Sequence, residues 1–239
     1  MAGNKRTEFR GYPKKSVEFF KGIRENNNRG WFEPRKQDYI RYCVKPTWDL
    51  INDLVPTVLK IDPHFQTDPS KMISRIYRDV RFSRDKSPYK SRLWFSFKRP
   101  GIDWQDAPGY YFEISHDSYG FGMGMYAPSK ETMQNFRRAI TLRPDEFLKA
   151  ISFLRSKKNI FSIGGDSYKR PPKENVDKRI IKWYVMKSFY FYCEKPVNNL
   201  LFSPGLADEV ALAYKTLAPL YRYLWKIKGE NTPPSNNTM

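Results

Sequence analysis

The chain has 239 residues, 40% of them hydrophobic and 16% aromatic, and a formal net charge of +18. This composition argues against a disordered chain, since disordered chains are poor in aromatic residues, and no apolar run is long enough to cross a membrane. With only two cysteines and two histidines, the chain is poorly supplied for a zinc cage or for a triad built on histidine.

The first quarter of the chain is predicted to be helical. Apolar residues at three- and four-residue spacing indicate a helix that begins near Ser16 and ends at the asparagines 26–28. A second, longer amphipathic helix is predicted from about residue 34 to residue 60. Pro46 and Pro56 interrupt its pattern, so we expect a kink or a break at one of them.

Three segments with alternating apolar residues follow, at 92–98, 109–115 and 118–126, and their short connections predict an antiparallel meander. In the third segment Gly120, Gly122 and Gly124 share one face. Alternate glycines weaken a strand. We therefore expect something to lie close against that face, either a packed helix or the backbone of a ligand or nucleic acid.

The last part of the chain is predicted to contain helices and one further strand. Ser129 is a plausible cap for a helix that breaks at Pro144, residues 188–193 form a buried strand candidate, and a final helix starts near Ser203 and should kink at Pro219. Altogether the sequence predicts an α+β fold, a central mainly antiparallel sheet with helices packed from the N- and C-terminal parts. The expected layout has three parts: a flexible basic arm at 1–11, a single domain at 12–228 and a disordered tail at 229–239.

The densest polar segment is residues 75–90, here called the basic loop, which holds four arginines, two lysines, two aspartates and two tyrosines. Arginine offers a planar fork that matches phosphate or carboxylate, and the cations here outnumber the acids. We expect an anion site in which Asp79 orients an arginine and Tyr89 donates a hydrogen bond. The predicted ligand-binding residues are Arg75, Arg78, Asp79, Arg81, Lys86, Tyr89 and Lys90.

Two other interpretations of the basic loop stay open. In the first, the loop belongs to an enzyme that acts on a small anionic substrate, and the acids available for catalysis are Asp79 and Glu113. In the second, the arginines and aspartates form an ion-pair lock that fixes the loop in an interaction protein. The sequence contains no glycine-rich nucleotide-binding motif, and no pattern in it identifies a cofactor.

The pattern Arg75-x-x-Arg78-Asp79-x-Arg81-Phe82-x-x-x-Lys86-x-x-Tyr89 resembles the signature of the DUF2461 family, which has no established function. The resemblance extends over nearly the whole chain. It includes Asn27-Asn28-x-x-Trp31-Phe32, Tyr39, Pro46, the glycine strand ending at Pro128, and the segment from Lys187 through Leu217-Ala218-Pro219-Leu220. The resemblance implies which residues are important to the family, but it does not imply any reaction.

The sequence therefore predicts a basic cytoplasmic protein that binds a phosphate-containing or other anionic ligand, with nucleic acid among the partners considered. The excess of positive charge favours polyanions, and aromatic residues alternate with lysines and arginines at 90–99, as in single-strand binding surfaces. Two distant cysteines outside any CxxC motif are typical of buried free thiols in a reducing compartment.

Overall fold

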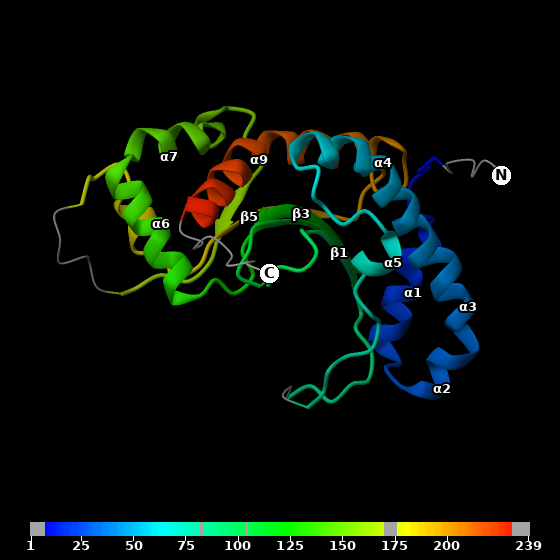
Figure 1. Cartoon of the computed structure of the whole chain (residues 1–239). Helices are drawn as coiled ribbons and strands as arrows, with labels where there is room; N and C mark the ends of the chain where they lie inside the picture. The colour runs from blue at the N-terminus through cyan, green and yellow to red at the C-terminus, as the bar shows by residue number, and fades with distance from the viewer. Residues whose placement is uncertain (1–7, 82–83, 104, 170–175, 231–239) are drawn as a thin grey trace, which may run out of the picture. The chain divides into compact units, whose positions relative to one another are not determined.

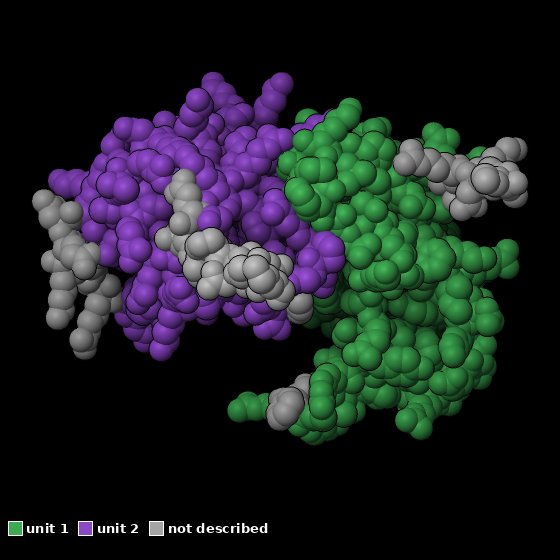
Figure 2. Space-filling view, in the orientation of Figure 1, with its two compact units in different colours: residues 1–97, 111–121, 194–213 green, residues 98–110, 122–193, 214–239 purple. Residues whose placement is uncertain are grey.

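The computed structural model describes residues 8–81, 84–103, 105–169 and 176–230. These residues group into two compact units, shown in Figure 2. Unit 1 contains residues 1–97, 111–121 and 194–213, and unit 2 contains residues 98–110, 122–193 and 214–239. The arm and tail expected at the two ends lie largely outside the description, although Phe9 is already buried and its N–H donates to Asp53 Oδ2 at 3.1 Å.

The predicted α+β fold with a mainly antiparallel sheet is confirmed. Five strands form one antiparallel sheet in the order β1-β2-β3-β5-β4 (Figure 1). Helices from the N- and C-terminal parts pack with it. The strands are β1 (Leu93–Phe97), β2 (Gly109–Ile114), β3 (Ser118–Gly124), β4 (Ser162–Gly164) and β5 (Tyr190–Pro196). Each strand predicted from the sequence is present, and β4 was not predicted.

The N-terminal helices of unit 1 follow the predicted pattern. Helix α1 (Lys14–Glu25) buries Phe19, Phe20 and Ile23 on one face and ends at Asn26. It lies beside α3 (Lys36–Tyr39), as Figure 1 shows. The remaining short elements are α2 (Arg29–Phe32), the 3-10 turn η1 (Glu33–Arg35) and α5 (Pro69–Met72).

The long helical stretch changes its hydrogen-bonding pattern just before Pro46. The π-helical turn η2 (Ile40–Val44) directly precedes α4 (Lys45–Ile61), while α4 continues through Pro56. Proline has no N–H and its ring crowds the carbonyl four residues back, which is that of Tyr42. The buried Ser16 hydroxyl donates to this Tyr42 carbonyl at 2.6 Å, so α1 supplies the hydrogen bond that Pro46 cannot make.

The glycine-rich face of β3 packs against a neighbouring strand. A Cβ added at Gly122 would overlap the carbonyl oxygen of Phe191, and one added at Gly124 would overlap the side chain of Tyr190. Both partners belong to β5, within unit 2. The close neighbour of these two positions is therefore the adjacent strand, where the sequence led us to expect a helix, a ligand or a nucleic acid.

Two predictions about the helices that follow β3 are confirmed. Ser129 caps α6 (Lys130–Leu142) by accepting from the Thr132 N–H, and Pro144 begins α7 (Pro144–Ala150). The final helix, α9 (Gly205–Glu230), runs on through Pro219 as one element. The short elements η3 (Ser152–Arg155) and α8 (Ile181–Tyr184) were not predicted.

Aromatic side chains fill much of the interior of unit 2. Phe136 of α6 contacts Phe147 and Phe189, with ring centroids 5.4 and 4.9 Å apart, and Trp183 stacks on Phe191 at 5.7 Å. Such rings bury large apolar areas and explain the high aromatic content. Among the described residues, no helix is long and apolar enough to cross a membrane.

Candidate functional site

The basic loop forms a narrow ribbon in unit 1, held at its base by backbone hydrogen bonds. Tyr77 pairs with Tyr89 in an isolated antiparallel bridge, the Arg78 N–H donates to the Pro88 carbonyl at 2.9 Å, and the Lys90 N–H donates to the Ile76 carbonyl at 2.8 Å. The described part of the loop forms neither a helix nor a regular strand. Phe82 of the signature lies outside the described residues.

Asn27 ties the base of the basic loop to the end of α1. Its side-chain amide donates to the Tyr89 carbonyl at 2.9 Å, and its side-chain oxygen accepts from the Tyr89 N–H at 3.0 Å. The Tyr89 ring is 1% exposed and its centroid lies 4.3 Å from that of Phe32. Its hydroxyl is buried without a hydrogen-bond partner among the described residues, so Tyr89 anchors the loop and does not present its hydroxyl to solvent.

Arg81 and Asp79 form an exposed pair within the basic loop. Arg81 donates from Nε and Nη2 to the two Asp79 oxygens at 3.0 and 2.7 Å, and its backbone N–H adds a third bond at 3.2 Å. The side-chain hydrogen bond from Arg81 is the main cause that lowers the pKa of Asp79 to about 2. A carboxylate so easily ionised is a weak base near neutral pH, so this geometry disfavours Asp79 as a catalytic base.

Arg78 and Lys86 are also engaged within the basic loop. Arg78 Nη1 lies 3.0 Å from Asp85 Oδ2, and Arg78 Nη2 donates to the Tyr89 carbonyl at 3.4 Å. Lys86 Nζ donates to the Val80 carbonyl at 2.9 Å. Together with the Arg81 pair, these contacts close the loop on itself, as the ion-pair lock interpretation expects.

The cations at the base of the basic loop are crowded. Lys90 Nζ donates to the Arg75 carbonyl at 2.9 Å. Burial, followed by the positive charges of Arg75, Arg78 and Arg92, lowers the pKa of Lys90. Among the described residues, the Arg75 guanidinium makes no hydrogen bond or ion pair, although its charge also reaches Asp79.

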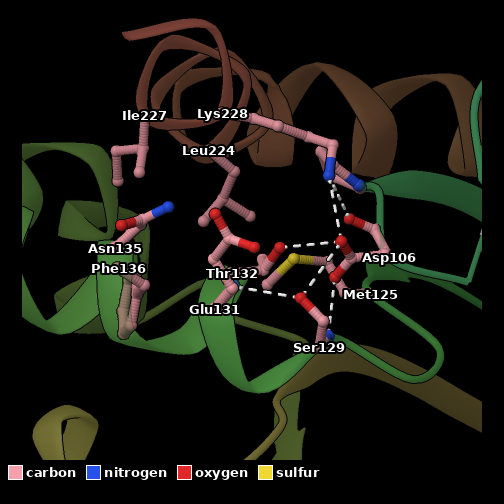
Figure 3. Close-up of a pocket in the computed structure, with 11 residues that line it drawn as sticks. Asp106, Met125, Ser129, Glu131, Thr132, Asn135, Phe136, Leu224, Ile227 and Lys228 are labelled. Atoms are coloured by element: carbon pink, nitrogen blue, oxygen red, sulfur yellow. Dashed lines mark hydrogen bonds and ion pairs between the residues drawn. The ribbon is translucent and has the colours of Figure 1, made fainter. Parts of the chain in front are cut away.

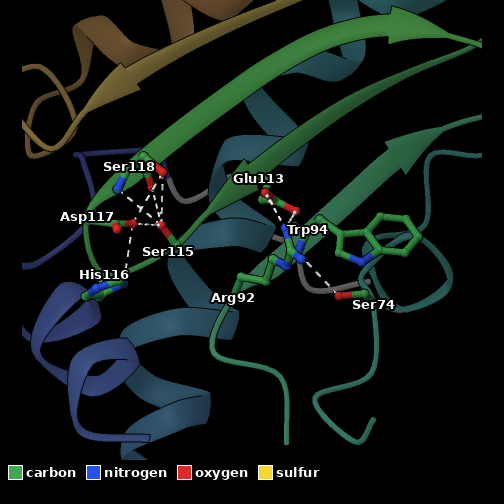
Figure 4. Close-up of polar contacts among 8 residues, drawn as sticks. All are labelled: Ser74, Arg92, Trp94, Glu113, Ser115, His116, Asp117 and Ser118. Carbon is green, nitrogen blue, oxygen red and sulfur yellow. Dashed lines mark hydrogen bonds and ion pairs between the residues drawn. The ribbon is translucent and has the colours of Figure 1, made fainter. Parts of the chain in front are cut away.

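Glu113, the second acid considered for catalysis, projects from β2 toward Arg92. Arg92 Nη1 lies 3.2 and 3.3 Å from its two carboxylate oxygens, as Figure 4 shows. Nearby, the Trp94 N–H donates to the Ser74 hydroxyl at 3.3 Å, which joins β1 to the segment before the basic loop. Glu113 therefore neutralises an arginine at the edge of the cationic group.

The turn between β2 and β3 brings a serine, a histidine and an aspartate together in unit 1 (Figure 4). Ser115 Oγ donates to Asp117 Oδ1 at 2.7 Å, and His116 Nδ1 lies 3.4 Å from the same oxygen. A triad needs a hydrogen bond between nucleophile and base; here both side chains turn to the carboxylate instead. Within the described residues, no three side chains of histidine, cysteine, aspartate or glutamate gather as metal ligands.

Two residues of this region were not assigned a role from the sequence. Asn27 was noted only as part of a motif, because nothing local indicates a hydrogen bond to a residue 62 positions away. Arg92 was noted only among the alternating basic and aromatic residues. Its position beside Lys90 is set by the turn into β1, and a period-two pattern alone does not show which outward cations meet.

The fold and this region define the class of protein: an α+β chain with one antiparallel sheet, and a basic loop whose cations exceed the acids that reach them. Residues 15–223 match the model of the DUF2461 family, described as a conserved hypothetical protein, and the chain belongs to this family. The resemblance seen in the sequence is thereby confirmed. No curated protein matches the chain.

Proposed function

We propose that the protein binds a phosphate-containing or other anionic ligand at the base of the basic loop, through Arg75 and Lys90. The observation that carries the proposal is the position of Lys90, whose Nζ donates a hydrogen bond to the Arg75 carbonyl at 2.9 Å. Burial, followed by the positive charges of Arg75, Arg78 and Arg92, lowers the pKa of Lys90. A group of like charges is unfavourable until a counter-charge arrives. An anion bound between Arg75 and Lys90 would relieve this repulsion.

The pairing of the other cations with acids supports the same assignment. Arg78 and Arg92 each already have an acid, Asp85 at 3.0 Å and Glu113 at 3.2 Å. Positive charge on Arg75 and Lys90 remains for a ligand. The proposal combines the ion-pair lock and the anion site considered from the sequence. Arg78, Arg81 and Lys86 hold the shape of the loop, and Arg75 and Lys90 bind the anion.

Nucleic acid is the ligand class that we test first, because the net charge of +18 favours polyanions over single small anions. The exposed Tyr77, whose ring is 5.5 Å from that of Tyr89, offers an aromatic surface beside the cations. Base stacking on such a ring would add affinity without sequence preference. We assign no reaction, because both acids considered for catalysis are paired with arginines.

Replacing Arg75 by glutamine should weaken binding of a fluorescent single-stranded oligonucleotide by roughly 3- to 10-fold and reduce the slope of log K against log salt by about 1, the loss expected for one phosphate contact. Fluorescence anisotropy at several salt concentrations measures both quantities. Inorganic pyrophosphate, used as a competitor, distinguishes a small-anion site from a nucleic-acid surface.

The matched control is Lys21→Gln, which removes the same charge from an exposed position on α1 in the same unit. It should leave affinity and salt slope close to those of the unmodified protein. Equal effects of the two substitutions would mean that only overall charge matters, and would contradict a site at the basic loop.

A further inference from the structure

A cavity of about 220 Å³ lies in unit 2 (Figure 3). It is lined by α6, by the C-terminal part of α9 and by the segment before β2. It is smaller than the roughly 300–1,000 Å³ of sites that hold drug-sized ligands. Its lining is partly apolar and partly polar. The apolar part is made by side chains that are at most 5% exposed: Met125, Phe136, Leu224 and Ile227.

Asp106 holds the polar side of the cavity together. Its carboxylate accepts from the Ser129 N–H at 2.7 Å, from Thr132 Oγ1 at 2.8 Å and from Lys228 Nζ at 3.2 Å. Burial opposes ionisation of Asp106, but these hydrogen bonds outweigh it and lower its pKa. Asp106 and Lys228 therefore neutralise each other and are committed to joining the segment before β2 to α6 and α9.

Glu131 and Asn135 are the polar side chains of the cavity that remain available. They stand four residues apart on α6 and so share a helix face. Figure 3 shows both side chains pointing from α6 toward α9 across the cavity. Among the described residues, neither side chain makes a hydrogen bond or ion pair.

The charges of the cavity determine which ligand it would accept. With Asp106 and Lys228 paired, the Glu131 carboxylate leaves the described lining with one negative charge, in a chain whose net charge is +18. An anion would meet repulsion there. A protonated amine could donate hydrogen bonds to the Glu131 carboxylate and to the Asn135 side-chain carbonyl, while an apolar body would cover Leu224 and Ile227.

We propose that this cavity is a binding site for a small organic cation, a primary amine with a short apolar body. The site lies wholly within unit 2 and its residues are separate from those of the basic loop. The proposal does not depend on the anion-binding function, because it takes a ligand of the opposite charge.

The test compares three probes of one size, n-hexylamine, n-hexanol and hexanoate, by following the methyl resonances of Met125, Leu224 and Ile227 during NMR titration. We expect n-hexylamine to bind at least about tenfold more tightly than n-hexanol, because one charge-assisted hydrogen bond contributes a difference of this size. Hexanoate should bind most weakly. The proposal would be overturned if hexanoate bound as tightly as n-hexylamine, or if none of the three probes bound.

Glu131→Gln keeps the shape of the side chain and removes its charge, so it should abolish the preference for the amine over the alcohol. Asp166→Asn makes the same charge change at an exposed position of unit 2 outside the cavity and should keep that preference. If the Glu131→Gln protein still prefers the amine by the same factor, the carboxylate is not the recognition group and the proposal fails.

Discussion

Replacing Gly122 by alanine should lower the free energy of unfolding by about 3 kcal/mol or more, the upper range of overpacking effects in well-packed interiors. The added Cβ would overlap the carbonyl oxygen of Phe191 and lie 3.0 Å from the Cα of Tyr192. Both obstacles are backbone atoms of β5. They cannot move aside without disturbing the antiparallel pairing of Phe191 and Tyr192 with β4.

Gly229→Ala is the matched control for this substitution. Gly229 lies in α9, and a Cβ built there meets no atom within 4 Å. Alanine favours a helix over glycine by up to about 1 kcal/mol, so this variant should be as stable as the unmodified protein or slightly more stable. Chemical denaturation measures both variants, and equal stabilities would contradict the close approach of β3 and β5.

The second large effect is expected at Asn27. Asn27→Ala should reduce stability by about 2–3 kcal/mol, because it leaves both the N–H and the carbonyl of the buried Tyr89 without their partners at 3.0 and 2.9 Å. The Tyr89 N–H should also lose protection from hydrogen exchange. Since Lys90 follows Tyr89 directly, the same variant should bind anions less tightly.

Asn26→Ala provides the comparison from the adjacent position. Among the described residues, the Asn26 side chain donates only to the Gly22 carbonyl at the exposed end of α1, at 3.1 Å. Its loss should change stability by a few tenths of a kcal/mol. If Asn27→Ala were no less stable than Asn26→Ala, the two hydrogen bonds would not anchor the basic loop, and the account of how Lys90 is positioned would fail.

The fold class could be predicted from the sequence because helices and strands each leave a periodic pattern of apolar residues. Leu93, Phe95 and Phe97 alternate with outward residues, and the structure buries all three. The strand β4 was missed because it has only three residues, which is too short for a period to be visible, and it exists through pairing with β5. Local sequence carries little information about such a partner.

The basic loop shows where sequence reasoning about a site ends. Residue types indicated a group of cations and a surplus of cations over acids within residues 75–90. They could not show that Arg81 pairs with Asp79, two residues away, or that Arg78 pairs with Asp85. They also suggested that Tyr89 would reach a ligand, whereas its ring is packed against Phe32. These outcomes depend on the path of the chain around the loop, and spacing alone leaves several paths open.

The prolines show a similar limit. Pro46 and Pro56 have the same intrinsic cost in a helix, and the sequence alone could not say which one would disturb it. The disturbance occurs beside Pro46, where the Ser16 hydroxyl of another helix bonds to the Tyr42 carbonyl. No local pattern in the sequence indicates this tertiary contact.

The central claim, that an anion binds among the crowded cations, is tested most directly by the pKa of Lys90. In the free protein, burial and the charges of Arg75, Arg78 and Arg92 hold this pKa below its ordinary value. A bound anion favours the protonated amine and must raise the pKa. By the same linkage, anion binding should weaken as the pH rises through the pKa of Lys90 in the free protein.

NMR titration of protein with carbon-13-labelled lysine measures this pKa, and Lys90→Gln identifies the resonance by its disappearance. The account predicts a lowered pKa in the free protein and a clear rise when inorganic pyrophosphate or a single-stranded oligonucleotide is added. A Lys90 pKa that stays the same in the presence of both ligands would contradict the proposed anion site.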